Sequence, residues 1–208
     1  MKHLSKLILW SFIVVGLVSC SSTSDQNASN LTSPTPAIYK VLPHVVENLI
    51  KRNYRVYDQP ELGYSIHYEV PYKVLADVYI YPLPENQMPF SNKDIVVGNS
   101  AHAIQEILHF EKKGVYKNVK VLDQAGWGSR DDMLLKTELT FLAKGQDRYS
   151  LIYFAQHMNS LVKIRMTMDN HSVNRQSGAW DNFAKKLMKQ IGTELRNKQA
   201  KRQETRGY

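Results

Sequence analysis

The stretch Tyr64-Ser65-Ile66-His67-Tyr68-Glu69-Val70, followed after a short connection by Val74-Leu75-Ala76-Asp77-Val78-Tyr79-Ile80-Tyr81, decides the fold. In the first run, apolar and aromatic side chains alternate with polar ones, which is the period of a strand with one face in water. The second run is a fuller strand, and Pro82 and Pro84 end it. Because the connection is hairpin-like, the two runs predict antiparallel pairing.

Further strand-like runs lie on both sides of this pair. They are Tyr54–Tyr57, Val115–Leu122, Met133–Ala143, Arg148–His157 and Leu161–Met168. The last three are joined by the short polar connections 144–147 and 158–160, which are typical of a meander. We therefore expect an antiparallel sheet of about six to seven strands.

Two stretches before the meander have the spacing of helices. The first covers 43–52, with Pro43 at its first position and its apolar residues on one face. The second covers Ser100–Lys113, with Asn99 or Ser100 as its cap, Ile104, Ile107 and Leu108 facing inward, and Gly114 at its end. The stretch 85–97 between strand and helix is predicted to be a loop.

The closing helix has the clearest pattern, because large apolar residues recur at spacings of three and four. They are Trp180, Phe183, Ala184, Leu187, Met188, Ile191 and Leu195. Such a stripe is typical of a helix packed on a sheet, although a membrane-surface helix with lysines has the same pattern. The order of elements predicts a single α+β domain, in which an N-terminal, a central and a C-terminal helix pack on the antiparallel sheet.

This order of elements, with the paired runs Tyr64–Val70 and Val74–Tyr81 ahead of a helix, a meander and a closing amphipathic helix, resembles the PsbP/Mog1-type αβα sandwich. The resemblance concerns element order alone and rests on no signature motif. Members of that architecture are mainly accessory or binding proteins, so the resemblance implies such a role and transfers no site residues.

The N-terminus has the features of an export signal. Lys2 and Lys6 accompany an apolar run, Leu7–Leu17, that is too short to span a bilayer as a helix. The run ends in Leu17-Val18-Ser19-Cys20, which resembles the bacterial lipobox, the recognition sequence of lipoprotein signal peptidase. The resemblance implies cleavage before Cys20 and attachment of a diacylglycerol and a further acyl chain there, which anchors a protein firmly.

The residues after the cysteine imply an address and a spacer. In Gram-negative lipoproteins an aspartate at this position commonly retains the protein at the inner membrane, so Ser21 implies the periplasmic face of the outer membrane. Residues 21–37 are rich in Ser, Thr, Asn and Pro and predict an extended linker. The chain therefore divides into a signal peptide (1–19), a lipidated cysteine with its linker (20–37), an α+β domain (38–196) and a basic tail (197–208).

The formal net charge of +8 is concentrated near the C-terminus. The basic residues beyond Gly178 are Lys185, Lys186, Lys189, Arg196, Lys198, Lys201, Arg202 and Arg206. A basic end of this kind attracts anionic lipid, polyanionic cell-wall polymer or nucleic acid, and the alternative is a solvated helix face that runs into a frayed tail. Nucleic acid is not expected as the partner of an exported protein.

Metal and thiol chemistry have little support in the sequence. Cys20 is the only cysteine, so its lipidation removes thiol nucleophiles, redox pairs and cysteine-bound zinc. His102, Glu106 and His109 share one helical face, but the apolar residues of that helix lie on the opposite side and no fourth ligand is evident. We expect the three side chains to face solvent and to bind no metal.

Other catalytic patterns are equally weak. Gly126-Trp127-Gly128-Ser129 lacks the strand-to-helix context of a nucleophile elbow, and Trp127 is either a loop residue tucked over the core or an exposed aromatic for a ligand. The carboxylates considered for glycoside hydrolysis are Glu61, Asp77, Glu138 and Asp169, and nothing in the sequence pairs them. The strand tyrosines are Tyr64, Tyr68, Tyr79, Tyr81, Tyr149 and Tyr153, and ordinary strand use explains them. We expect no catalytic residue and no cofactor.

The sequence thus predicts a membrane-anchored envelope lipoprotein whose domain is a non-enzymatic binding or accessory module. Its expected contacts are the membrane, through lipidated Cys20, and other envelope proteins or an anionic envelope polymer. Two alternatives stay open: an envelope hydrolase with a site assembled from scattered residues, and direct binding of the basic end, 178–208, to anionic lipid or cell-wall polymer.

Overall fold

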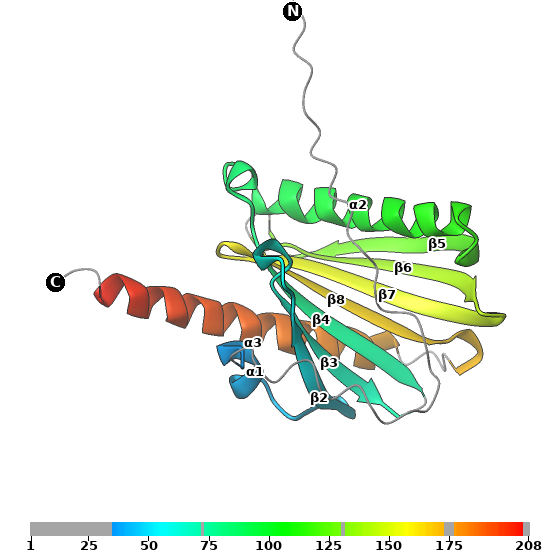
Figure 1. Cartoon of the computed structure of the whole chain (residues 1–208), viewed down its shortest axis with the longest axis horizontal. Helices are drawn as coiled ribbons and strands as arrows, with labels where there is room; N and C mark the ends of the chain where they lie inside the picture. Colours follow the sequence, from blue (N-terminus) through cyan, green and yellow to red (C-terminus); the bar gives the residue numbers. More distant parts are fainter. Residues whose placement is uncertain (1–34, 72, 130–131, 173–176, 206–208) are drawn as a thin grey trace, which may run out of the picture. The chain divides into compact units, whose positions relative to one another are not determined.

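An eight-stranded antiparallel sheet organises the computed structural model, which describes residues 35–71, 73–129, 132–172 and 177–205 (Figure 1). The strands are β1 (Val45–Val46), β2 (Leu49–Val56), β3 (Tyr64–Val70), β4 (Val74–Pro82), β5 (Tyr116–Trp127), β6 (Leu134–Ala143), β7 (Gln146–His157) and β8 (Ser160–Asp169). The helices are α1 (Ala37–Val41), α2 (Asn92–Lys112) and α3 (Ser177–Glu204), with short 3-10 turns at Pro60–Leu62, Glu85–Gln87 and Asn170–Ser172. The order of strands in the sheet is β1-β2-β3-β4-β8-β7-β6-β5.

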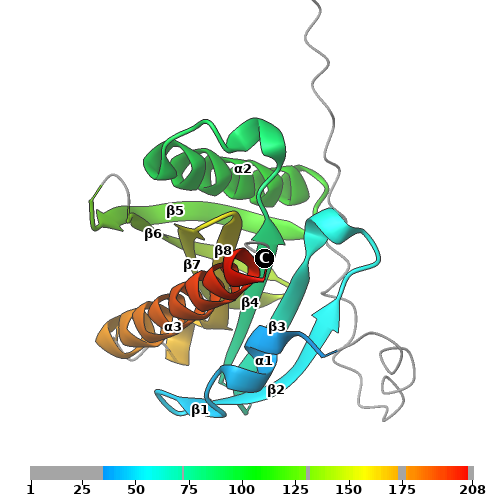
Figure 2. The ribbon, with the colours of Figure 1, turned by 90° about the vertical axis from the view of Figure 1, so that its left-hand side faces the viewer.

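Strand β8 joins the two halves of the sheet, because it pairs with β4 on one side and with β7 on the other. Residues that alternate along each strand point to opposite faces. One face packs against α3, where Ile164 and Tyr153 contact a core that includes Phe183. The other face packs against α2 through residues such as Leu139 and Ile152. Figures 1 and 2 show α2 and α3 on opposite sides of the sheet.

The tight connections follow from local backbone chemistry. Lys144 and Gly145, between β6 and β7, both have positive φ, of 51° and 75°. This is the left-handed geometry of a two-residue hairpin turn, and glycine adopts it without a steric penalty. Gly114, with φ of 74°, ends α2 in the same region of conformational space, as its position after the predicted helix indicated.

The fold class and most of the sheet agree with the sequence prediction. Strands β3 and β4 form the predicted hairpin, and β6, β7 and β8 form the predicted meander. The number of strands is eight rather than six to seven, because the chain ahead of β3 contributes a second, shorter hairpin.

The predicted helix over 43–52 is wrong. The segment forms the β1–β2 hairpin instead, with Val45 paired to Ile50 and Val46 paired to Leu49. Glu47 and Asn48 have positive φ, of 47° and 70°, which is the geometry of a tight hairpin turn and is incompatible with a helix. The N-terminal helix is the short α1, which precedes this hairpin and buries Ile38.

Helix α2 begins earlier than predicted, so the predicted loop over 85–97 ends at Ser91. The Ser91 hydroxyl accepts a 3.2 Å hydrogen bond from the backbone N–H of Asp94 and caps the helix. Ser100, predicted as a cap, lies in the middle of α2, where its hydroxyl is 3.1 Å from that of Thr137 in the core. Of the residues predicted to point inward, Ile107 is buried, whereas Ile104 and Leu108 are half-buried.

Helix α3 continues to Glu204, so the residues 197–204 of the predicted basic tail extend the helix. Its core-facing residues are those of the predicted stripe, from Phe183 to Ile191, with Trp180 and Leu195 partly buried. Among the described residues, no helix combines the length and the apolar composition that crossing a bilayer requires.

Candidate functional site

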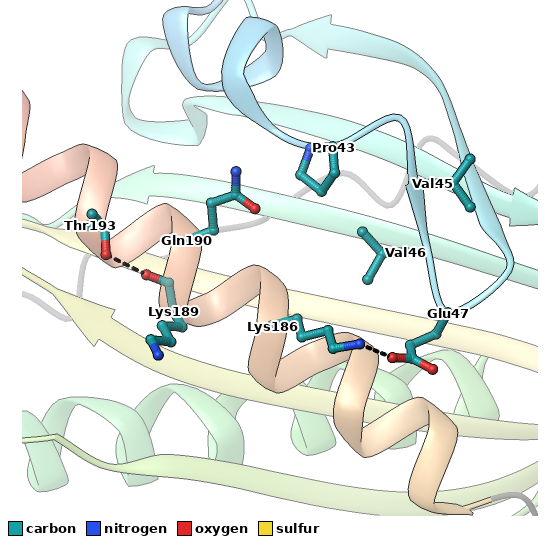
Figure 3. Close-up of a pocket in the computed structure, with 8 residues that line it drawn as sticks. All are labelled: Pro43, Val45, Val46, Glu47, Lys186, Lys189, Gln190 and Thr193. Atoms are coloured by element: carbon teal, nitrogen blue, oxygen red, sulfur yellow. Dashed lines mark hydrogen bonds and ion pairs between the residues drawn. The ribbon is translucent and has the colours of Figure 1, made fainter.

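A groove lies between α3 and the β1–β2 hairpin. We call it the α3 groove, and it has a volume of about 480 Å³. It is lined by Pro43, Val45, Val46, Glu47, Lys186, Lys189, Gln190 and Thr193. Figure 3 shows Lys186 reaching across it to Glu47, with which it forms an ion pair. Val45 is 54% exposed, so the groove combines apolar hairpin residues with a basic helical rim.

The period of α3 positions this basic rim. Because residues three and four apart share a helical face, the buried stripe of α3 leaves its lysines on the outer side. The exposed cations of α3 are Lys185, Lys186, Lys189, Arg196, Lys198, Lys201 and Arg202. Within the described part of the chain, only Lys186 of this set forms an ion pair. The surface of α3 is therefore strongly positive.

The last turns of α3, residues 196–204, contain no buried side chain. We call this segment the basic extension. The end of α1 lies beside α3, because Gln190 donates a 3.0 Å hydrogen bond to the carbonyl oxygen of Val41. The hydroxyls of Thr35 and Tyr54 lie 3.1 Å apart and hold the start of the described chain on β2.

A buried ion cluster lies between the first turns of α3 and the sheet. Lys136, which is 7% exposed, lies 2.6 Å from Glu138 and 3.5 Å from Asp181. Tyr149 donates a hydrogen bond to Glu138, and Tyr153 donates one to Asp181, at 2.5 and 2.6 Å. Every member has a partner in the cluster, so the geometry is that of a structural network that fixes α3 on β6 and β7.

The pKa shifts in this cluster follow from burial and its ion pairs. Burial alone lowers the pKa of Lys136, but the hydrogen bond and charge of Glu138 and the charge of Asp181 outweigh it and raise the pKa. Burial also opposes ionisation of Glu138, yet Lys136 and Tyr149 lower the pKa of this carboxyl group below its usual value. The network is thus charged at neutral pH.

Trp127 is the last residue of β5 and not a loop residue. Its ring is half-buried, with Lys185 Nζ 4.9 Å and Lys136 Nζ 5.4 Å from its centroid. These are cation–π distances. Gly126, Gly128 and Ser129 line a shallow second pocket of about 450 Å³ with Trp127 near the start of α2.

Of the candidate metal residues on α2, His102 and His109 are exposed as predicted, whereas Glu106, which was expected to face solvent with them, is half-buried. His102 Nδ1 lies 3.7 Å from Glu106, whereas His109 contacts the ring of Phe110. Among the described residues, no group of three His, Cys, Asp or Glu side chains has the geometry to hold a metal ion.

The carboxylates considered for hydrolysis are not brought together. Asp77 and Glu138 lie on opposite faces of the sheet, since their neighbours Val78 and Leu139 belong to different core clusters. Glu61 lies in an exposed 3-10 turn, and Asp169 accepts a hydrogen bond from the backbone N–H of His171. None of the four lines either of the two pockets described above.

The strand tyrosines divide between the two faces. Tyr68, Tyr149 and Tyr153 are buried on the α3 face, with Tyr64 partly buried beside them. Tyr79 and Tyr81 are half-buried on the opposite face, where their rings lie parallel with centroids 5.9 Å apart.

Cys20, the predicted signal peptide and the predicted linker up to residue 34 lie outside the described residues.

Sequence reasoning missed the α3 groove. It predicted a helix over 43–52, where the structure has the β1–β2 hairpin that forms one wall of the groove. It also missed Lys136, although a lysine directly after Leu134 and Leu135 in a predicted strand is a recognisable signal of a buried or paired charge.

No model of a known protein family matches the chain, and no curated protein does. The solved structures similar to it include the PsbP protein of the cyanobacterium Synechocystis sp. PCC 6803, known as CyanoP, at 9% identity and a TM-score of 0.46, covering 64% of this chain and 78% of that one. A second is PA94 of Pseudomonas aeruginosa, a protein of unknown function, at 11% identity and a TM-score of 0.36, covering 62% of this chain and 78% of that one. Neither likeness bears on what this chain does.

Proposed function

We propose that the chain is an envelope lipoprotein, held on a membrane by lipid on Cys20, whose domain is a non-enzymatic binding module. The lipobox-like sequence Leu17-Val18-Ser19-Cys20 supports the anchor. The observation that carries the binding role is the row of exposed cations along α3, which extends past the core into the basic extension. The partner that fits this row is the anionic headgroup layer of the membrane that holds the anchor.

The position of α1 supports this partner. The chain joins the domain at α1, directly beside α3, and the segment from Cys20 to Thr35 spans at most about 50 Å when fully extended. An anchored domain therefore samples the membrane at a high effective concentration, and the cations of α3 are close to the point of attachment. Each lysine or arginine near an anionic surface contributes about 1 kcal/mol, and salt weakens that attraction.

Trypsin protection in vesicles tests the contact. The lipidated full-length protein would be reconstituted into vesicles of phosphatidylcholine alone or with phosphatidylglycerol. We expect Lys198, Lys201 and Arg202 to be cleaved more slowly in the anionic vesicles, and the protection to disappear at high salt. Equal cleavage in both vesicle types would refute the contact.

A charge-matched pair of variants sharpens this test. Replacement of Lys198, Lys201 and Arg202 by glutamine removes cations from the basic extension, whereas replacement of Lys117, Lys120 and Lys144 removes as many exposed cations from the sheet. The response to anionic lipid is measured as slower tryptic cleavage at Lys185 and Lys189, which both variants keep. Only the first variant should lose this protection. If both variants lose it, net charge and not the α3 surface is responsible.

The anchor itself is tested by the intact mass of protein extracted from membranes with detergent. We expect a chain that begins at Cys20 and carries the added mass of acyl groups. An unmodified thiol at Cys20, or a chain that retains residues 1–19, would contradict the proposal.

The α3 groove favours a second partner, an envelope protein, because Val41 and Val45 expose apolar surface beside its lysines. A photo-crosslinking residue at Val45 in intact cells should capture a defined protein. The same residue at Val121, which is exposed on β5 at the other edge of the sheet, serves as the control. Identical products at both sites would exclude the groove as a specific contact.

A further inference from the structure

A pair of cations lies on the sheet face opposite α3. Tyr79 of β4 is directly opposite Lys163 of β8, and Asp77 is directly opposite Arg165. These residues alternate with Val78, Val162 and Ile164, which pack in the core under α3. The side chains of Lys163 and Arg165 therefore point to the same side of the sheet as α2.

Lys163 is held against an aromatic wall. Its Nζ lies 4.5 Å from the ring centroid of Tyr79 and 5.5 Å from that of Tyr81. Burial lowers the pKa of this lysine to about 8, with the charge of Arg165 acting in the same direction and those of Glu106 and Asp77 opposing it. The ammonium group is thus poorly solvated, and no described carboxylate lies within ion-pair distance of it.

Arg165 has an unused donor. Its guanidinium lies 5.9 Å from the ring centroid of Phe141, and its Nη2 is buried without a hydrogen-bond partner. Buried polar groups are normally hydrogen-bonded, and an unpaired buried donor is costly. The planar fork of an arginine fits the two oxygens of a carboxylate or a phosphate.

The nearby acids already have partners. The Asp77 carboxylate lies 2.9 Å from Nδ1 of His67. Glu69 lies 2.9 Å from Arg52 and 3.6 Å from His67. Glu106 of α2 lies 3.7 Å from His102. Among the described residues, neither cation on β8 forms an ion pair, although the charges of Glu106 and Asp77 act on Lys163 from a longer distance.

We propose that this face binds a small oxyanion, a carboxylate or a phosphate, between Lys163 and Arg165. Residues two apart on one strand lie on the same face of the sheet and are separated by about 7 Å, so one anion on this face is within electrostatic reach of both cations. Tyr79 and Tyr81 form the wall of the site beside Lys163. The site lies on the opposite face from α3 and does not depend on the proposed membrane contact or on the lipid anchor.

Titration of the full-length protein in detergent with inorganic phosphate, and separately with acetate, tests the site. Calorimetry should give saturable binding of at least one anion, and the Nε–H signal of Arg165 should shift in nuclear magnetic resonance spectra. The anion that saturates identifies the ligand class as phosphate or carboxylate. Signals that rise linearly with both anions would overturn the proposal.

Variants distinguish a binding role from a structural one. Arg165→Gln and Lys163→Gln should each weaken binding by roughly tenfold or more, as expected for the loss of a charge-assisted hydrogen bond. Lys163→Arg keeps the charge and should retain most of the affinity, which a purely structural effect on folding would not predict. Arg165→Lys keeps the charge but loses the planar fork, so it should bind more weakly than the parent and more tightly than Arg165→Gln. Lys120→Gln, which removes an exposed cation from β5 at the edge of the sheet, is the charge-matched control and should bind as the parent does.

The dependence of binding on pH provides a separate readout. Lys163 loses its proton as the pH rises through about 8, so affinity should fall there. The fall should be absent in Lys163→Arg, whose side chain stays charged. Equal affinity of all variants, or a fall with pH that persists in Lys163→Arg, would refute the assignment of the site.

Discussion

Tyr153, in the middle of β7, donates a 2.6 Å hydrogen bond to Asp181 near the start of α3. Tyr153 is fully buried, and Asp181 also lies 3.5 Å from the buried Lys136. Burial and the neighbouring charge of Asp181 both raise the pKa of Tyr153, so the phenol stays a donor. The start of α3 is therefore fixed on the sheet by a polar contact as well as by apolar packing.

Tyr153→Phe should lower the free energy of unfolding by about 1–3 kcal/mol, because it leaves the half-buried carboxylate of Asp181 without this donor and keeps the ring. Urea denaturation at neutral pH measures the loss. Tyr39→Phe is the comparison, since the Tyr39 hydroxyl donates an exposed hydrogen bond to Arg52. Equal losses in the two variants would mean that the contact with Asp181 has no special weight.

Gly192→Ala should destabilise the fold, against the usual trend for a glycine in a helix. A Cβ at this position would lie 2.7 Å from Nδ1 of the half-buried His157 ring, so the ring or α3 must shift. Overpacking of this kind costs about 1–3 kcal/mol. Gly98→Ala in α2 meets nothing within 4 Å and should instead stabilise by about 0.5–1 kcal/mol. Thermal unfolding of both variants decides the matter, and the prediction fails if both gain stability.

The central hairpin and the meander were predictable, because their apolar residues alternate with a period of two. The β1–β2 hairpin was not, because Val45, Val46, Leu49 and Ile50 fit a helical spacing and a four-residue hairpin pairing equally well. The β-branched valines and the ability of Asn48 to adopt positive φ favour the hairpin. The spacing of apolar residues therefore distinguishes a helix from a hairpin here only when the preferences of the turn residues are considered as well.

The start of α2 was missed for a similar reason. Gly98 counts against a helix, yet Ser91 followed three residues later by Asp94 is an N-terminal capping pattern, and it decides the boundary. The partners of Lys136 and of Arg165 were beyond the sequence, since they depend on which strands become neighbours in the sheet. The exposed face of α3 was predictable from period alone, whereas its neighbour across the groove was not.

Acid should destabilise the protein through His157. Burial lowers the pKa of this imidazole, with Asp132 opposing and Arg196 assisting, and its Nε2 has no hydrogen-bond partner. The folded state thus holds the proton less tightly than the unfolded state, so stability is full above about pH 6.5 and falls as the pH drops through the lowered value. Urea midpoints between pH 7.5 and 5 should show a flatter profile for His157→Asn than for the parent.

His67 should act in the opposite direction. Burial opposes its protonation, but the hydrogen bond and charge of Asp77 and the charge of Glu69 outweigh burial and raise the pKa. This contribution is complete below about pH 6.5 and is lost as the pH rises through the raised value. The stability difference between the parent and His67→Asn should therefore shrink as the pH increases, and a constant difference would show that the ion pair contributes nothing.

Lys136→Met should be the most damaging of these substitutions, because it leaves the half-buried carboxylates of Glu138 and Asp181 without the cation between them. Removal of one partner from a buried ion pair costs about 3–5 kcal/mol.

In the Lys136→Met variant, the desolvated carboxylates would take up protons more readily than in the unfolded chain, so its stability should recover as the pH falls from 7 toward 5. The parent should not gain stability from acid in this way, because Lys136 keeps the pKa of Glu138 below its usual value. Adding Glu138→Gln to Lys136→Met should restore part of the loss at pH 7, and a double variant no more stable than the single one would show that charge imbalance is not the cause.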